Sequence, residues 1–109
     1  MPAIEIFRST ITTLVARDTP DLTARQMAVF LATYCEDTPQ TVRGLAQSLN
    51  VAKPAITRAL DRLETFNYIE RKEDHTDRRS IIVGRTPKGR QFFTNLKNIL
   101  TEAETPPPN

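Results

Sequence analysis

Residue types that catalytic and metal sites commonly need are scarce in this 109-residue chain. It has one histidine, one cysteine and three glycines, with no glycine-rich phosphate loop and no cluster of metal-ligating side chains. These absences argue against an enzyme and against a bound metal or cofactor. The single cysteine, Cys35, also excludes an internal disulfide and fits a reducing cytoplasm. We expect its side chain to be buried and structural, because no basic residue lies near it in sequence to activate the thiol.

Long apolar runs are also missing. No stretch approaches the roughly 18 apolar residues that a membrane helix needs, so we predict no contact with a membrane. The first ten residues lack a basic stretch followed by an apolar core, and we expect no secretory signal and a cytoplasmic location. The composition, 39% hydrophobic and 26% charged, is that of a folded domain. We predict one domain over residues 1–104 and a disordered, proline-rich tail at residues 105–109.

Positive charge is small overall but concentrated in one segment. The formal net charge is +2, yet residues 53–90 hold ten Lys and Arg against six Asp and Glu. Residues 1–52 hold four against five, and residues 91–109 hold one against two. A basic patch on a nearly neutral chain can attract phosphate backbones, although charge alone does not identify the partner.

Apolar residues spaced three and four apart predict five helices. The first covers residues 4–16 and carries an apolar stripe that must pack against the body or against a second copy of the chain: Ile4, Phe7, Ile11, Leu14 and Val15. Thr23 and Thr41 are predicted N-caps of the second and third helices. The fourth helix covers residues 53–65, and Thr86 with Pro87 begins the fifth.

The third and fourth helices are separated by a short turn, Asn50-Val51, which is the pattern of a helix-turn-helix. After Asn67 the hydrophobic period changes to alternation, and residues 68–71 and 81–83 are strand candidates around a charged loop at residues 72–80. A β-hairpin following a helix-turn-helix is a wing. The predicted fold class is therefore mainly α with a small β-hairpin, a winged helix-turn-helix.

The fourth helix has one core face and one polar face. Ile56, Leu60 and Leu63 fall on one stripe and are predicted to be core. The opposite side carries Pro54, Ala55, Arg58, Asp61, Arg62 and Thr65. Small residues early in the helix let it enter a major groove about 12 Å wide, where Arg58 could reach a guanine edge and the flanking Lys53 and Thr57 could reach phosphates. The alternative is an ordinary charged surface with side chains paired at helical spacing.

Two arginines, Arg78 and Arg79, lie at the predicted tip of the hairpin. Narrow minor grooves concentrate negative potential and attract guanidinium groups. Asp77 beside them could hold an arginine extended through a bidentate pair. The alternative is a solubilising turn, and we interpret His75 in the same loop as a solvated residue.

Combined, these motifs resemble the MarR family of bacterial winged-helix regulators. The resemblance covers about residues 22–93 and rests on T-R-x-x-D-R-L-E from Thr57, D-R-R from Asp77 and T-x-x-G from Thr86. The upstream L-T-x-x-Q and L-A-x-x-L-N segments fit as well. The resemblance implies major-groove contacts, and it implies that Asp77 supports Arg79 in the minor groove. The residues implied at the major groove are Lys53, Pro54, Ala55, Thr57 and Arg58.

The chain also departs from this family. Family members carry longer helical arms at both ends, which form a dimer and enclose an effector pocket, and here both arms are short. The sequence remains compatible with a homodimer that forms through Ile4–Val15 and Phe92–Leu100. It no longer supports a small-molecule effector. Asn67 stands where the family usually has glycine, and it can adopt the same positive φ.

The sequence therefore favours a homodimeric regulator that binds double-stranded DNA sequence-specifically. Its DNA-binding residues would be Lys53, Pro54, Ala55, Thr57, Arg58, Arg62, Asp77, Arg78 and Arg79. One alternative is a winged-helix module that docks on another regulator, since fold does not fix function. Another is a monomeric DNA binder that acts with a partner.

Overall fold

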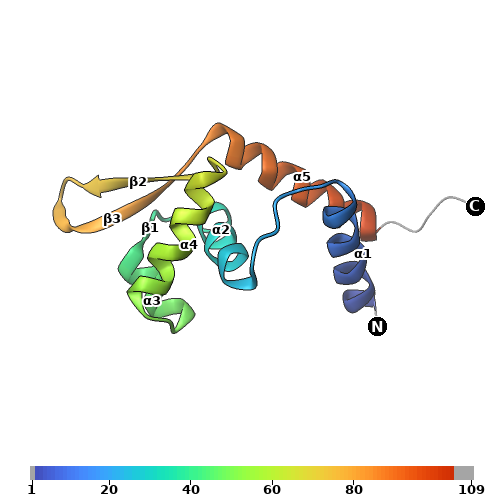
Figure 1. The fold of residues 1–109 in the computed structure, drawn as a ribbon, viewed down its shortest axis with the longest axis horizontal. Coiled ribbons are helices and arrows are strands. Elements are labelled where there is room, and N and C mark those ends of the chain that lie inside the picture. The colour runs from blue at the N-terminus through green and yellow to red at the C-terminus, as the bar shows by residue number, and fades with distance from the viewer. Residues whose placement is uncertain (1, 105–109) are drawn as a thin grey trace, which may run out of the picture. The chain divides into compact units, whose positions relative to one another are not determined.

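The computed structural model describes residues 2–104, which contain five helices and three short strands (Figure 1). In chain order these are α1 (Pro2–Ala16), α2 (Ala24–Cys35), β1 (Gln40–Thr41), α3 (Val42–Leu49), α4 (Lys53–Thr65), β2 (Ile69–Asp74), β3 (Asp77–Arg85) and α5 (Pro87–Glu104). The predicted class, mainly α with a small β-hairpin in a winged helix-turn-helix, is confirmed. The predicted tail at residues 105–109 lies outside the described residues.

Local capping sets the start of each helix in the helix-turn-helix region. Thr23 forms the predicted capping box with Gln26, with bonds of 3.1 and 3.0 Å in the two directions. The hydroxyl of Thr41 accepts a 2.9 Å bond from the amide of Gly44 at the start of α3. Asn50 ends α3 with φ 56°, the left-handed conformation that lets the chain turn sharply into α4. Three predicted features, the two caps and the turn, are thereby confirmed.

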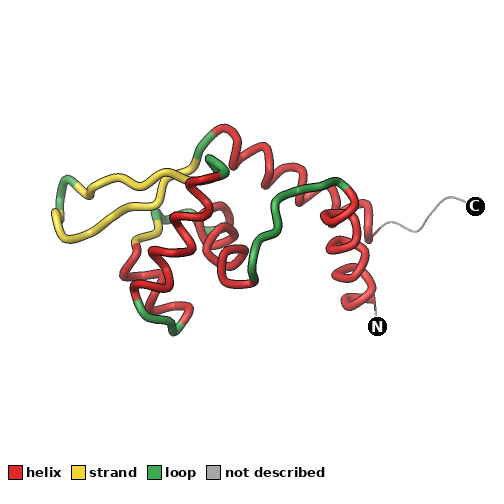
Figure 2. The backbone as a smooth tube through the Cα atoms, in the orientation of Figure 1, coloured by secondary structure: helices red, strands yellow, loops and turns green. Residues whose placement is uncertain are grey.

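The wing is a three-stranded antiparallel sheet in the order β1-β3-β2 (Figure 2). Its hairpin is longer than predicted, because the charged residues assigned to a loop at residues 72–80 belong mostly to β2 and β3. Only His75 and Thr76 lie between the two strands. The sequence also gave no sign of β1, whose two residues pair with Val83 and Ile82.

The described chain separates into two compact units, one of which is Leu22–Arg90. Its core is built from the apolar faces of α2, α3 and α4 together with the start of the sheet. The largest fully buried side chains are Phe30, Leu45, Ile56, Leu60, Leu63, Ile69 and Val29. These residues fix α4 to the body by one face and leave its other face toward solvent.

Tyr34 joins the end of α2 to the two segments that flank the wing. Its hydroxyl donates to the carbonyl of Tyr68 at 2.7 Å and accepts from the amide of Thr86 at 3.1 Å. The hydroxyl of Thr86 accepts a 2.9 Å bond from the amide of Gly89, so the predicted cap at the start of α5 is confirmed. A Cβ on Gly89 would overlap the Tyr34 hydroxyl and the Tyr68 carbonyl. The close approach of α5 to this hydroxyl therefore requires glycine.

The other unit combines α1 with most of α5. In α1, Thr10 and Leu14 are buried, whereas four apolar side chains are exposed: Ile4 (55%), Phe7 (60%), Ile11 (43%) and Val15 (68%). In α5, Phe92, Leu96 and Ile99 are buried and Leu100 is 37% exposed. Most of the apolar stripe of α1 is thus left uncovered by residues 2–104, whereas most of the apolar face of α5 is buried. Within the described residues, no helix has the length and apolar character needed to cross a membrane.

Candidate nucleic-acid interface

The exposed face of α4 carries polar and cationic side chains. Pro54 lies in the first turn of α4, where a missing N–H costs no hydrogen bond. Lys53, Pro54, Thr57 and Arg58 are all exposed. Neither Lys53 nor Arg58 has an ion-pair partner among the described residues. The apolar face that holds α4 to the body therefore leaves two unpaired cations at its solvent side.

Ala55 differs from the sequence interpretation, whereas Arg62 is exposed as expected. Ala55 is only 7% exposed, so its placement on the outer face was wrong. It lies next to Ile56 and, with Ala59, widens the buried stripe of the helix. Arg62 is exposed, but its guanidinium lies over the ring of Phe66, 4.6 Å from the centroid. This cation–π contact restrains Arg62 at the carboxyl end of α4.

The tip of the wing is a turn at His75 and Thr76, not the Asp77-Arg78-Arg79 segment. Asp74 closes the turn, since its Oδ1 accepts bonds from the amide and hydroxyl of Thr76 at 2.9 and 2.7 Å. These bonds from Thr76 favour the charged carboxylate and lower the pKa of Asp74 below its ordinary value. The turn is therefore built from side-chain hydrogen bonds rather than from glycine.

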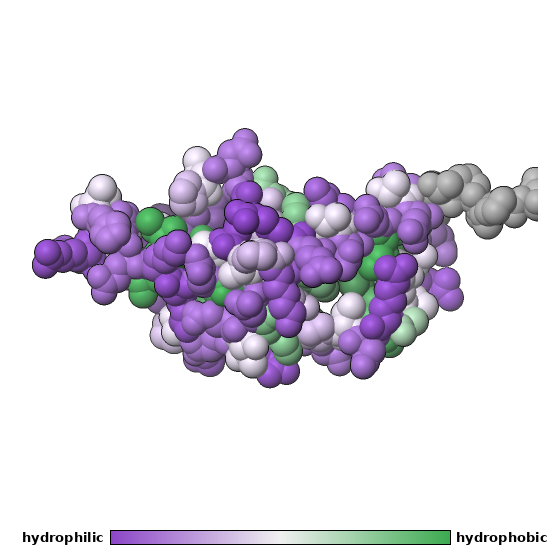
Figure 3. Space-filling model, turned by 90° about the horizontal axis from the view of Figure 1, so that it is seen from above, coloured by the Kyte–Doolittle hydropathy of each residue, from purple (hydrophilic) through white to green (hydrophobic). Residues whose placement is uncertain are grey.

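Arg78 and Arg79 lie on the first residues of β3 and are exposed. The pairing is irregular here, because Glu73 lies opposite Ile81 whereas the next residue, Asp74, lies opposite Asp77. Both arginines therefore lie in an irregular stretch of β3. The wing tip is hydrophilic in Figure 3.

Asp77 supports the backbone of Arg79 rather than its side chain. Its Oδ1 accepts a 3.0 Å bond from the amide of Arg79, and its Oδ2 accepts a 3.2 Å bond from the hydroxyl of Ser80. The guanidinium groups of Arg78 and Arg79 form no ion pair within the part of the chain that is described. The bidentate pair expected from the sequence is absent from this structure, and both guanidinium groups are available.

An ion cluster connects the wing to α4. Arg71 of β2 donates from Nε to Glu64 Oε2 at 3.0 Å and from Nη2 to Asp61 Oδ1 at 2.7 Å. A third bond of 3.2 Å joins Nη2 to Glu64 Oε1. The pKa of Arg71 is raised, above all by the hydrogen bond to Glu64. No sequence pattern predicted this cluster, because its members are seven and ten residues apart and meet only through the turn after α4.

A further exposed cation, Arg43, lies on α3 without an ion pair among residues 2–104. Arg43 was not predicted as a site residue, because it is an isolated charge outside the basic segment. Cys35 is exposed, which corrects the expectation that it is buried. The absence of a nearby basic residue does not decide burial: Tyr34, the preceding residue, is buried, whereas Cys35 is exposed at the end of α2.

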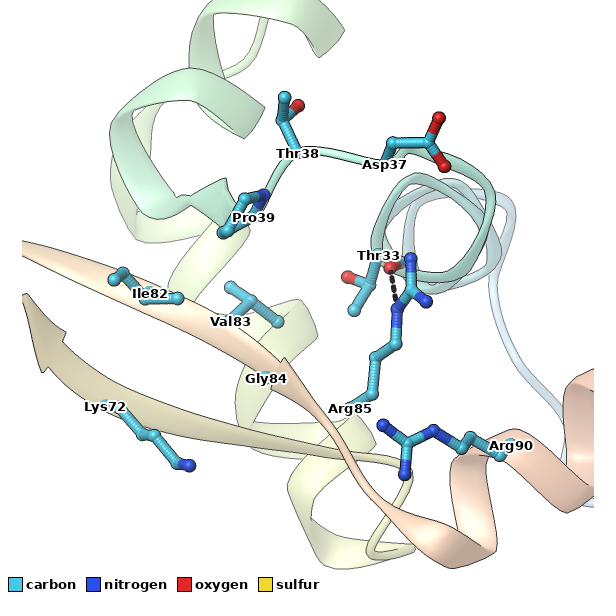
Figure 4. Close-up of a pocket in the computed structure, with 10 residues that line it drawn as sticks. All are labelled: Thr33, Asp37, Thr38, Pro39, Lys72, Ile82, Val83, Gly84, Arg85 and Arg90. Atoms are coloured by element: carbon cyan, nitrogen blue, oxygen red, sulfur yellow. Dashed lines mark hydrogen bonds between the residues drawn. The ribbon is translucent and has the colours of Figure 1, made fainter.

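A cavity of about 330 Å³ lies between β2 and β3 of the wing and the segment that follows α2 (Figure 4). It is lined by Thr33, Asp37, Thr38, Pro39, Lys72, Ile82, Val83, Gly84, Arg85 and Arg90. Arg85 is already engaged, because its guanidinium donates to the carbonyls of Thr33 at 2.9 Å and Glu36 at 2.7 Å. It thereby neutralises the carboxyl end of α2. No grouping of His, Cys, Asp and Glu over residues 2–104 could hold a metal ion.

Comparisons with known proteins agree with this architecture. The sequence model of the MarR family matches residues 22–81, which is more than half of the chain. A comparison with curated protein sequences finds no match.

Among solved structures, the transcriptional regulator Tm0710 from Thermotoga maritima is 23% identical with a TM-score of 0.76, covering 92% of this chain and 68% of that one. The regulator BldR from Sulfolobus solfataricus is 32% identical with a TM-score of 0.65, covering 92% and 72%. Reduced AbfR, solved bound to DNA, is 23% identical with a TM-score of 0.68, covering 87% and 66%. From the family match and the similarity to BldR, the chain belongs to the MarR family of transcription regulators.

Proposed function

We propose that this protein is a sequence-specific regulator that binds double-stranded DNA as a homodimer, with α4 in the major groove and the wing in the minor groove. The observation that carries the proposal is the availability of four exposed cations on α4 and β3. Lys53, Arg58, Arg78 and Arg79 have no carboxylate partner among the described residues. The cations Arg8, Arg17, Arg71 and Lys72 are paired, but others such as Arg25, Arg43 and Lys88 have no ion pair within residues 2–104, so the proposal rests on the grouping of the four on α4 and β3. Because these four side chains form no ion pair in the described part of the free protein, no such pair has to be broken when they bind phosphates or base edges.

Each residue has a separate role in this proposal. Arg58 contacts a base edge, since arginine presents a planar pair of donors that suits guanine. Lys53, Pro54 and Thr57 lie against the backbone at the leading end of α4, and Arg62, stacked on Phe66, contacts a phosphate. Ala55 contributes small size rather than a contact, because it is buried.

Arg79 is the wing residue we assign to the minor groove. Both arginines lie in the irregular stretch of β3 between Asp77 and Ile81, and we choose Arg79 because its backbone is the one fixed by a hydrogen bond. Asp77 holds the Arg79 backbone, and Arg78 contacts a flanking phosphate. The similarity to AbfR, a relative solved with DNA, supports the same partner.

The homodimer is inferred from the four exposed apolar side chains of α1. Ile4, Phe7, Ile11 and Val15 recur at intervals of three and four residues, so they form one stripe along the helix. A contiguous exposed apolar stripe marks an interaction surface. From the predicted C-terminal segment, Leu100 is exposed enough to join it, while Phe92, Leu96 and Ile99 are already buried.

Docking on another protein through α4 has less support. The large hydrophobic side chains exposed among residues 2–104 are on α1, β3 and α5, and α4 has none. The cores of protein interfaces are depleted of charged residues, whereas this face of α4 carries Lys53, Arg58 and Arg62.

The test is selection from a pool of random DNA duplexes followed by sequencing, with wild-type protein and the Arg79→Ala variant. We expect a two-fold symmetric motif with half-sites about 10 base pairs apart, weakened in the variant. Binding should also weaken steeply with salt, because each neutralised phosphate releases counterions. No enrichment, with both proteins behaving alike, would refute the proposal and favour a protein partner.

A further inference from the structure

The Arg71 cluster is the outermost side-chain link between the wing and α4. Side-chain exposures are 26% for Arg71, 35% for Glu64 and 58% for Asp61. The guanidinium is thus partly shielded and is bound by carboxylates from two successive turns of α4. Two carboxylates on one planar group fix its orientation as well as its position.

Beyond this link the hairpin has no comparable support. Among the described residues, no hydrogen bond or ion pair from residues 72–81 reaches outside the hairpin. The polar contacts there are local, joining Lys72 to Glu70, Asp74 to Thr76, and Asp77 to Ser80. Strand β1 pairs with Val83 and Ile82, which lie opposite Arg71 and Lys72, and so ends one residue beyond Arg71. Figure 1 shows the remainder of β2 and β3 extending away from α3 and α4.

A direct role of Arg71 on DNA fits these contacts poorly. Its donors Nε and Nη2 are occupied, and the cluster holds one positive and two negative charges. A net negative cluster does not attract a phosphate. The same carboxylates would, if released, leave two uncompensated negative charges on the helix that we propose enters the major groove.

We propose that Arg71 is a positioning residue for DNA binding, which holds the wing at a fixed angle to α4 so that Arg79 and Arg58 reach the two grooves together. The proposal rests on the proposed function for its consequence on DNA. The geometric part, a wing restrained through Arg71, holds for the free protein. Restraining the wing before binding lowers the entropy lost when Arg79 is ordered on the duplex.

The first experiment measures wing geometry without DNA. Spin labels are placed at His75→Cys on the tip and Gln47→Cys on α3, in full-length protein carrying Cys35→Ser because that thiol is exposed. Pulsed electron paramagnetic resonance then gives the distance distribution between the labels. We expect Arg71→Met to broaden the distribution, and Lys72→Met, which removes the same charge from the adjacent position, to leave it unchanged. An identical distribution for wild type and Arg71→Met would overturn the proposal.

The second experiment measures coupling on the selected duplex. We expect Arg79→Ala to weaken binding about ten-fold in the wild-type background and only about two-fold when Arg71 is methionine, because a misplaced wing no longer uses Arg79. Arg71→Lys keeps the charge but cannot bind both carboxylates in one plane, and it should give an intermediate coupling. It also replaces the methionine variant if that variant does not fold. Equal effects of Arg79→Ala in all backgrounds would contradict the positioning role.

Failure of the two proposals can be separated. If wild-type protein enriches no duplex, the proposed function fails while the distance measurement still tests the restraint. If the duplex is bound but the distance and the coupling are unaffected by Arg71→Met, only the positioning role is lost.

Discussion

Helices α1 and α4 are both amphipathic, yet they present opposite kinds of side chain to solvent. Helix α4 buries its apolar residues, among them Leu60 and Leu63, and exposes Lys53 and Arg58. Helix α1 buries Thr10 and Leu14 and exposes an apolar stripe that includes Phe7. An amphipathic pattern thus predicts that the apolar face of a helix packs on another surface, but it does not show whether that surface belongs to the same chain or to a partner.

The difference indicates two different partners. Exposed apolar area is stabilised by excluding water, so the α1 stripe suits a second apolar surface. Unpaired guanidinium and ammonium groups are well hydrated when free and gain most from a polyanion, so the α4 face suits DNA. Changes on the two helices should therefore affect different properties: association for the α1 stripe and DNA binding for the exposed face of α4.

Truncating an apolar side chain to alanine should destabilise the fold far more on α4 than on the exposed stripe of α1. Leu60→Ala removes a fully buried side chain of α4 and should lower the free energy of unfolding by about 2–5 kcal/mol. Ile11→Ala on the exposed stripe should cost less than about 1 kcal/mol in dilute protein, because much of that side chain is already in water. Urea denaturation measures both. If the cost of Ile11→Ala rises with protein concentration, the stripe is covered in an oligomer.

A charge placed on the α1 stripe should break the proposed dimer. Phe7→Glu should weaken association by at least about 2 kcal/mol, or roughly thirty-fold, since it buries an unpaired carboxylate. Sedimentation equilibrium measures the dissociation constant. The matched control is Ser9→Glu, which adds the same charge on the opposite side of α1. Equal dissociation constants for the two variants would show that this stripe is not the interface.

A change on α4 should instead affect DNA and leave association intact. Arg58→Ala should cost about 1–3 kcal/mol of binding and relax the preference at one base position. Arg8→Ala provides the control, because it removes an exposed arginine from α1, where it pairs with Glu5 at 3.8 Å. Fluorescence anisotropy with duplex variants measures both. Unaltered base preference in Arg58→Ala would move the recognition role elsewhere on α4.

Sequence patterns predicted the helical scaffold well, because its determinants are local. The spacing of apolar residues predicted the observed bounds of α4. The preference of helix N-caps for threonine predicted the capping roles of Thr23, Thr41 and Thr86. The burial of Ala55 was missed because small residues carry little hydrophobic signal of their own. Its position beside Ile56 places it within a buried arc wider than the stripe of large residues.

The wing was predicted in kind but not in detail. Its charged residues do not alternate with apolar ones, so strand pairing beyond Arg71 left no pattern in the sequence, and the tip was assigned to Asp77 instead of His75 and Thr76. The partners of Arg71 were also unpredictable, since they depend on the register of β2 and on the turn after α4. Contacts that depend on tertiary geometry are the part of the candidate site that only the structure supplies.

The smallest expected effect is a change in the pKa of Asp74 in the wing turn. Side-chain hydrogen bonds to Asp74 close this turn, whereas the side chains of the α1 stripe are positioned by a regular helix. Since Thr76 lowers the pKa of Asp74, the carboxyl should titrate below its ordinary value of 3.8 in carbon-detected NMR. The folded-state pKa is depressed, so the stabilising contribution is present above the unfolded value and is lost as pH falls through the folded one.

Thr76→Val removes the hydroxyl donor and should raise the titration midpoint of Asp74. Ser80→Ala is the control and should leave this midpoint unchanged, because the Ser80 hydroxyl bonds to Asp77 instead. A midpoint that Thr76→Val leaves unchanged would mean that the turn in solution is not held by this bond, and that the polar surface needs other support at its tip.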